Sequence, residues 1–75
     1  MCNEIPKIAP KPEYNCGDVV EVILSDLNKT YRKGHVRERI WHYKNHVWYY
    51  YLDVEGKKAS KRYRTTDLRP IIHIR

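Results

Sequence analysis

Four short runs, separated by turn residues, constrain the fold of this chain more than any other feature. Strand-forming residues fill the first three runs, the fourth is cationic, and a fifth, very short run follows near the carboxyl end. None of the runs has the apolar spacing of a helix. The five predicted strands cover residues 19–24, 34–43, 47–55, 57–64 and 71–74. Strands this closely spaced predict a single all-β domain, a small five-stranded barrel.

The length of the chain limits what this domain can hold. A domain of 75 residues buries only about 60% of the surface that its unfolded chain exposes. The apolar content of 41% is adequate for a compact core but not for a core with a large ligand cavity. The Asp, Glu, His and Cys residues form no recognisable nucleophile, phosphate-loop or acid–base motif. We therefore expect a non-catalytic domain without cofactor or small-molecule substrate, which binds its partners at the surface.

Two segments without strand character complete the predicted domain. Residues 1–13 contain three prolines, and each proline fixes φ and removes a backbone donor. We therefore expect an extended N-terminal arm over residues 1–13 and the barrel over residues 14–75. Before the last strand, residues 65–68 have the composition of a single 3₁₀ turn, which Pro70 ends.

Alternation of apolar and polar residues assigns the faces of the strands. The third strand alternates most clearly, with aromatic and aliphatic residues on one face. The second strand has no purely apolar face, and a bulge between Glu38 and Trp41 explains this conflict. The residues that we assign to the core are Val20, Val22 and Leu24 in the first strand and Trp48, Tyr50, Leu52 and Val54 in the third.

Positive charge is concentrated at one end of the sequence. Residues 1–55 carry eight Lys or Arg and eight Asp or Glu, so these charges cancel. The formal net charge of +6 therefore lies wholly within residues 56–75. Clustered cations attract polyanions and release counterions from phosphates, which indicates a nucleic-acid partner. The alternative is a solvated edge strand whose lysines prevent aggregation.

The aromatic residues are seven Tyr and two Trp, without any Phe. Tyrosine has an apolar ring and a polar tip, so it suits half-buried surfaces and surfaces that stack on ligands. Trp41, Tyr49 and Tyr51 fall on faces that we assign outward, beside Arg37 and Arg39. Such interleaving is typical of single-stranded nucleic-acid platforms, where stacking contributes about 1–3 kcal/mol per base. Binding of a peptide or protein, or simple cross-strand pairs that cover a small barrel, remain the alternatives.

Several motifs follow one another in order between residues 14 and 74. They are Gly17-Asp18-x-Val20, Gly34-x-Val36, the aromatic run from Trp48 to Val54, Tyr63, and Asp67-Leu68-Arg69-Pro70. This order resembles the SH3-like small barrels, which include Tudor domains, KOW domains and the DNA-binding C-terminal domain of retroviral-type integrases. The resemblance implies a surface that binds DNA, RNA, methylated peptides or protein partners. A Tudor-like site would be an aromatic cage for methylated lysine, with Glu38, Asp53 or Glu55 as an acidic wall.

The histidines and cysteines give no metal-binding pattern. A structural zinc site needs four ligands, usually as closely spaced pairs of Cys or His. Cys2 and Cys16 lie too far apart to form such a pair, and the four histidines are dispersed. We therefore expect no metal.

Targeting and redox signals are weak. The sequence has no charged-then-apolar leader and no run of about 18 apolar residues, so no membrane association is expected. One bridge between Cys2 and Cys16 would be an unusual framework, so we expect free thiols. These observations together predict a cytoplasmic protein.

We conclude that the sequence predicts a basic SH3-like module that binds nucleic acid, either DNA or RNA, mainly through phosphates and also by stacking. The alternative is a protein-interaction adaptor within a larger complex. Its partner would be bound by strand addition, either at the free edge of the fourth strand or at the N-terminal arm. The predicted nucleic-acid-binding residues are Arg37, Arg39, Trp41, Tyr49, Tyr51, Lys57, Lys58, Lys61, Arg62, Arg64 and Arg69.

Overall fold

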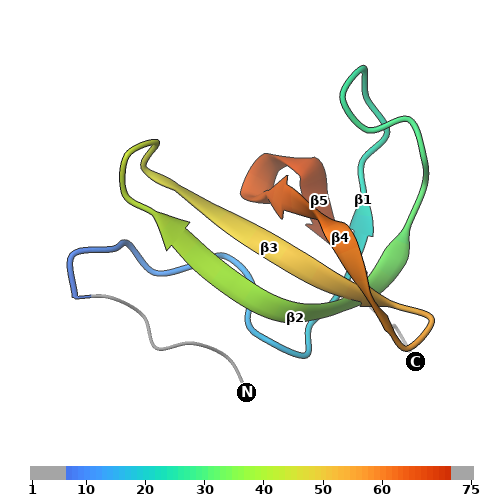
Figure 1. The fold of residues 1–75 in the computed structure, drawn as a ribbon, viewed down its shortest axis with the longest axis horizontal. Coiled ribbons are helices and arrows are strands. Elements are labelled where there is room, and N and C mark those ends of the chain that lie inside the picture. Colours follow the sequence, from blue (N-terminus) through green and yellow to red (C-terminus); the bar gives the residue numbers. More distant parts are fainter. Residues whose placement is uncertain (1–6, 72–75) are drawn as a thin grey trace.

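The computed structural model of the chain describes residues 7–71, and within them it forms one antiparallel sheet (Figure 1). The strands are paired in the order β4-β3-β2-β1-β5. A 3₁₀ turn, η1, stands directly before the last strand, as the sequence predicted. The elements are β1 (Val19–Val22), β2 (Lys33–His42), β3 (Val47–Val54), β4 (Lys57–Arg64), η1 (Thr65–Asp67) and β5 (Leu68–Pro70). The all-β class is therefore confirmed.

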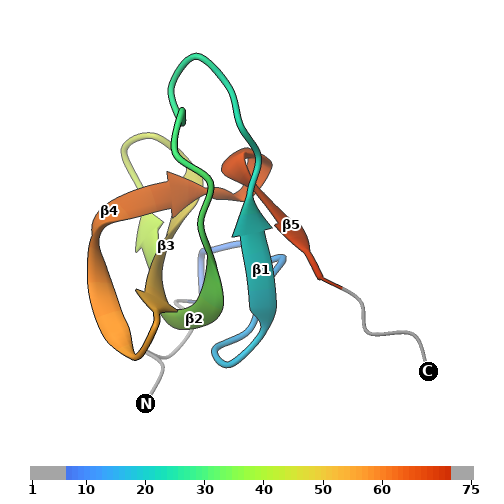
Figure 2. The ribbon, with the colours of Figure 1, turned by 90° about the vertical axis from the view of Figure 1, so that its right-hand side faces the viewer.

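The sheet is not closed into a barrel, which corrects the prediction. β4 and β5 are the two ends of the strand order and are not paired with each other. The sheet nevertheless curls strongly, as Figure 2 shows. Because β5 is only three residues long and β1 only four, their ladders are too short to carry the pairing around to β4.

The fifth strand also lies earlier in the chain than predicted. It covers Leu68–Pro70, where Pro70 pairs with Val20. A proline is tolerated there because β5 is an edge strand, whose outer side needs no backbone donor. The predicted strand over residues 71–74 is not formed at Ile71, and residues 72–74 lie outside the described residues.

A bulge in β2 decides which side chains face the core. It lies between Val36 and Glu38, which is closer to the start of the strand than the predicted position between Glu38 and Trp41. Before the bulge, Val36 pairs with Leu52; after it, Arg39 pairs with Tyr50. The extra residue shifts the alternation by one, so that Arg39 joins the buried row of β3.

The core is built around the predicted apolar face of β3. The alternation of Trp48, Tyr50 and Leu52 is confirmed, and Val54 packs against the cluster while only partly buried. Leu24, in contrast, is 57% exposed, because β1 ends at Val22 and the chain leaves the sheet there. The buried cluster comprises Tyr14, Val20, Val22, Val36, Trp48, Tyr50, Leu52, Tyr63 and Leu68.

The segment before β1 is held against this core by side-chain hydrogen bonds. The indole Nε1 of Trp48 donates to the carbonyl oxygen of Pro10 at 2.9 Å. The backbone N–H of Glu13 donates to the Tyr50 hydroxyl at 3.2 Å. Tyr14 is buried, and its hydroxyl donates to the Leu68 carbonyl at 3.0 Å. These bonds satisfy buried polar groups, so this part of the predicted arm is an ordered cover of the sheet.

Gly34 allows β2 and β3 to approach each other closely. A Cβ atom at this position would clash with the backbone carbonyl oxygen of Asp53. The absence of a side chain at Gly34 is thus a steric requirement of the bend in β2.

Cys16 is disulfide-bonded, so the expectation of reduced cysteines is wrong for this residue. Cys2 lies outside the described residues. Structural disulfides are rare in the reducing cytoplasm, so the cytoplasmic prediction loses one of its supports. Within residues 7–71, no helix has the length and apolar character that crossing a membrane requires.

Candidate nucleic-acid interface

The side of the sheet opposite the core carries a mixed aromatic and charged surface, which we name the outer face. The register places Tyr51 opposite Arg62 and Tyr49 opposite Arg64. Because side chains of paired residues point to the same side of a sheet, the tyrosines and arginines share one surface. The outer face includes His35, Arg37, Glu38, Ile40, Tyr49, Tyr51, Asp53, Lys58, Arg62 and Arg64.

Two cations of β4 lie over tyrosine rings of β3. The guanidinium carbon of Arg62 lies 4.1 Å from the centre of the Tyr49 ring. The ammonium nitrogen of Lys58 lies 4.8 Å from the centre of the Tyr51 ring. Both distances are within the range of cation–π interactions. The basic strand and the aromatic strand therefore contribute to the same side of the molecule.

Two ion pairs neutralise part of this outer face. Lys58 Nζ lies 2.8 Å from Glu38 Oε1, and Arg37 Nη1 lies 2.8 Å from Asp53 Oδ1. The hydrogen bond from Lys58 lowers the pKa of Glu38, and the hydrogen bond to Asp53 raises the pKa of Arg37. Lys58 and Arg37 are thus already engaged with carboxylates, which reduces what they add to a phosphate contact.

Arg69 is separate from the outer face. It lies on β5, at the opposite end of the strand order from β4. Its Nε atom donates to Glu21 Oε2 at 2.8 Å, and the Tyr31 hydroxyl donates to the other oxygen of Glu21 at 2.9 Å. The hydrogen bonds from Tyr31 and Arg69 lower the pKa of Glu21. This group ties β1, β5 and the end of the β1–β2 loop together.

Arg39 and Trp41 do not belong to the outer face, so their predicted assignment to an outward face is wrong. The bulge in β2 turns them toward the row of Tyr50 and Trp48. Arg39 Nη1 donates to the carbonyl oxygen of Tyr14 at 3.2 Å and to Asn15 Oδ1 at 2.7 Å. Trp41 packs against the core, with its ring centre 5.6 Å from that of Trp48. Both residues hold the segment before β1 and the core in place.

Lys57 stands apart at the start of β4. It pairs with Val54 and is exposed. Arg64 lies at the other end of the same strand. Among the residues that the structure describes, no carboxylate pairs with it. Lys57 therefore adds charge near the β3–β4 turn, away from the contacts of Arg62.

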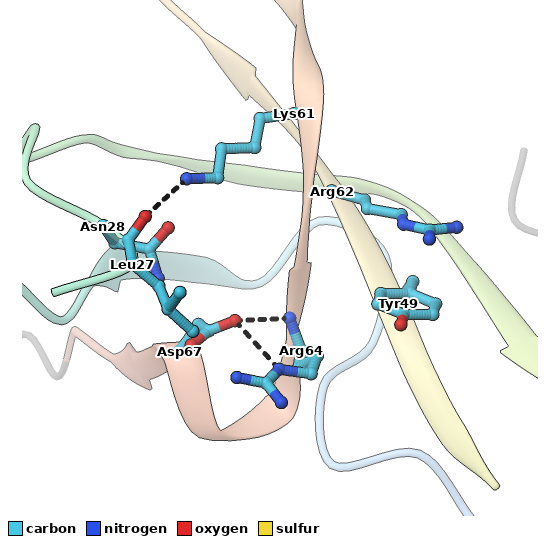
Figure 3. Close-up of a pocket in the computed structure, with 7 residues that line it drawn as sticks. All are labelled: Leu27, Asn28, Tyr49, Lys61, Arg62, Arg64 and Asp67. Atoms are coloured by element: carbon cyan, nitrogen blue, oxygen red, sulfur yellow. Dashed lines mark hydrogen bonds and ion pairs between the residues drawn. The ribbon is translucent and has the colours of Figure 1, made fainter. Parts of the chain in front are cut away.

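A pocket of about 350 Å³ lies around the edge of β4, and we name it the β4 pocket (Figure 3). Figure 3 shows Lys61 and Arg62 leaving the strand in opposite directions, so that the pocket collects side chains from both sides of the sheet. The ammonium of Lys61 donates to the Leu27 carbonyl oxygen at 3.0 Å. The residues that line the β4 pocket are Leu27, Asn28, Tyr49, Lys61, Arg62, Arg64 and Asp67.

Asp67 closes one side of the β4 pocket. Its Oδ2 atom accepts the backbone N–H of Arg64 at 3.0 Å, which fixes the start of η1. The Arg64 Nε atom lies at 3.5 Å from the same oxygen, a long contact for an ion pair. Arg64 is therefore only loosely engaged, and its remaining nitrogens are available to a ligand.

Sequence reasoning missed three lining residues of the pocket, namely Leu27, Asn28 and Asp67. The first two belong to the long β1–β2 loop, and surface loops of this kind commonly carry binding residues. Asn28 is only 3% exposed, and its Oδ1 atom has no hydrogen-bond partner among the described residues. No pattern in the sequence places this loop beside β4, because the contact joins segments that are far apart in the chain.

No group of three or more His, Cys, Asp or Glu side chains within residues 7–71 is arranged to hold a metal ion.

A family model described as "Family of unknown function (DUF6960)" matches residues 3–69 of the chain, which is most of its length. No curated protein and no solved structure matches it.

Proposed function

We propose that this chain, which belongs to the DUF6960 family of unknown function, is a small non-catalytic module that binds single-stranded nucleic acid. The outer face supplies rings for base stacking, and the cations of β4 supply phosphate contacts. The strand order and the 3₁₀ turn before β5 also support its resemblance to the SH3-like barrels, where such surfaces bind nucleic acids. The resemblance concerns the fold, so the argument for binding depends on the residues below.

The contact between Arg62 and Tyr49 is the observation that carries this proposal. The guanidinium carbon lies 4.1 Å from the ring centre, and no carboxylate pairs with Arg62 among the described residues. Arg62 therefore presents a planar guanidinium with unused donors, which lies over the face of an aromatic ring. A nucleotide needs this combination, because its phosphate accepts hydrogen bonds while its base stacks on a planar group.

The ion pairs make the expected phosphate footprint smaller than the sequence suggested. Four of the predicted cations pair with carboxylates: Arg37, Lys58, Arg64 and Arg69. The cations of β4 that no described carboxylate pairs with are Lys57, Lys61 and Arg62, and Arg64 adds less charge because Asp67 partly neutralises it. If about three phosphates are neutralised on a single strand, log K falls with log salt with a slope of about −2.

A fluorescence-anisotropy titration with labelled single-stranded DNA and RNA at two salt concentrations tests this function. We expect binding at low salt, weaker binding at high salt, and similar weakening for all base sequences in Arg62→Ala. Lys44→Ala, in the turn between β2 and β3, is the matched control because it also removes one exposed cation. Lack of binding at low salt, or equal effects of the two variants, would contradict the proposal.

A second candidate function, binding of a protein partner, is favoured by two exposed leucines in the β1–β2 loop. Leu24 and Leu27 are 57% and 69% exposed, and such apolar side chains in one loop are typical of interaction surfaces. β4 is also an edge strand, which an extended peptide can pair with. A pull-down with and without nuclease treatment separates the two functions: a partner retained after nuclease and at high salt supports the protein interaction.

A further inference from the structure

We propose that the β4 pocket binds the terminal phosphate monoester of a nucleic-acid strand, rather than a phosphodiester inside the strand. This inference rests on the proposed function and assigns one end of the ligand to one place on the molecule. The pocket is about 350 Å³ in volume, near the lower end of the range of about 300–1,000 Å³ for pockets that hold whole drug-sized ligands, so a single phosphate group fits in it.

Cations from both sides of the sheet reach this pocket because β4 is an edge strand. Lys61 belongs to the core side, where its Nζ lies 5.6 Å from the centre of the buried Tyr63 ring. Arg62 belongs to the outer face and lies over Tyr49. Inside a sheet, a neighbouring strand would keep two such side chains apart. At the free edge of β4 both side chains line the same pocket, although they leave the strand in opposite directions (Figure 3).

The charges in the pocket match a monoester better than a diester. Lys61, Arg62 and Arg64 carry three positive charges, and Asp67 carries one negative charge, which leaves a net charge of two. A phosphate monoester carries about −1.5 to −2 at pH 7, whereas a phosphodiester carries a single negative charge. The ammonium of Lys61 has three donors, of which the Leu27 carbonyl uses one. The others can bind phosphate oxygens.

Walls on two sides of the pocket also favour a strand end. The β1–β2 loop forms one wall, and it projects past the end of the sheet in Figure 2. Reciprocal backbone hydrogen bonds between Ser25 and Asn28, at 2.9 and 3.2 Å, hold this loop in shape. Asp67 of η1 forms the other wall. A nucleic-acid strand that crosses the outer face past Tyr49 and enters this pocket would therefore have its end between the β1–β2 loop and η1.

Anisotropy titrations with one single-stranded 10-mer in three forms test the inference. The forms carry a 5′-phosphate, a 3′-phosphate, or hydroxyls at both ends. We expect one phosphorylated form to bind about tenfold tighter than the hydroxyl form, as one further charge-assisted hydrogen bond would provide. This ratio should fall to about one in the Lys61→Ala/Arg64→Ala double variant and persist in Lys57→Ala, whose side chain does not line the pocket.

Competition on the unaltered chain provides a measurement that does not depend on how a variant folds. At equal ionic strength, inorganic phosphate should displace more of the phosphorylated 10-mer than chloride does. Inorganic phosphate should displace less of the hydroxyl form. Equal affinity for all three forms would overturn this inference and leave the proposed function intact. A preference that survives in the double variant would also overturn it. Absence of binding by every form would overturn both proposals.

Discussion

The guanidinium carbon of Arg62 lies 4.1 Å from the centre of the Tyr49 ring, although the strand register does not pair these residues. Tyr49 pairs with Arg64, and Tyr51 pairs with Arg62, so the Arg62 side chain reaches diagonally along the sheet. Diagonal neighbours on one face are within reach of long side chains. This contact restricts the Arg62 side chain before any ligand binds, so less side-chain conformational entropy is lost on binding.

Replacing Tyr49 by leucine should weaken binding of single-stranded nucleic acid. The loss of one stacking surface costs about 1–3 kcal/mol, which is about a 5- to 150-fold increase in Kd. Tyr49→Phe keeps the ring and should bind nearly as the unaltered chain does. Anisotropy titrations measure all three proteins, with Tyr43→Leu in the exposed β2–β3 turn as the control. Unchanged binding by Tyr49→Leu would exclude stacking at this ring.

Replacing Glu38 by glutamine should strengthen binding, because it releases Lys58 from its ion pair. Lys58 Nζ lies 2.8 Å from Glu38 Oε1, and the released ammonium can bind another phosphate. The slope of log K against log salt should steepen by about 0.7 for a single strand. Glu55→Gln removes the same charge from the β3–β4 turn, where no described cation is paired with it. If both variants steepen the slope equally, net charge rather than release of Lys58 is responsible.

Replacing Gly34 by alanine should destabilise the fold without any change in surface charge. A Cβ atom at this position would clash with the Asp53 carbonyl oxygen, which is backbone and cannot rotate away. Overpacking of this kind costs about 1–3 kcal/mol, and a rigid neighbour places the loss at the upper end. Urea unfolding measures the change, with Ser60→Ala on the exposed side of β4 as the reference. An equal free energy of unfolding for the two variants would show that β2 and β3 can separate locally at little cost.

Stability should fall in acid partly because Glu21 loses its partners. The hydrogen bonds from Tyr31 and Arg69 lower the pKa of Glu21 below its ordinary value of 4.5. The folded state therefore binds this proton less readily than the unfolded state. The stabilisation is complete above about pH 4.5 and disappears as the pH falls through the lower pKa of the folded state.

Unfolding by urea at several pH values between 7 and 3 checks this linkage (an interval set by the ordinary carboxyl pKa of about 4). Glu21→Gln should be less stable than the unaltered chain at neutral pH, and the difference should shrink toward the acid end. Glu55→Gln serves as the carboxylate control. A difference that stays constant with pH would assign the role of Glu21 to packing instead of ionisation.

Local patterns predicted the strands well where one face is buried throughout. The alternation of β3 and the turn Thr65–Asp67 follow from side-chain periodicity and from short-range hydrogen bonds. The closing pairing of a barrel, in contrast, depends on the lengths of β1 and β5, which end where tertiary contacts end. Alternation continued through Ile23 and Leu24, so the sequence alone did not show that β1 stops at Val22.

The candidate site was predicted in part, for the same reason. Tyr49, Tyr51 and Arg62 share the outer face because they follow simple alternation in β3 and β4. The exclusion of Arg39 and Trp41 depends on the position of one bulge, which composition does not determine. Ion pairs across strands, such as that of Lys58, depend on register. Register becomes known only when both strands are placed.

The bulge between Val36 and Glu38 gives the family a simple means of changing its surface. A relative of equal length that paired these two strands without the bulge would show the counterpart of Trp41 to solvent and bury the counterpart of Ile40, since side chains alternate along a strand. The order of the strands would be untouched. Loss of the bulge at constant length, and not loss of the extra residue itself, would thus exchange an aliphatic surface residue for an aromatic one on the same scaffold.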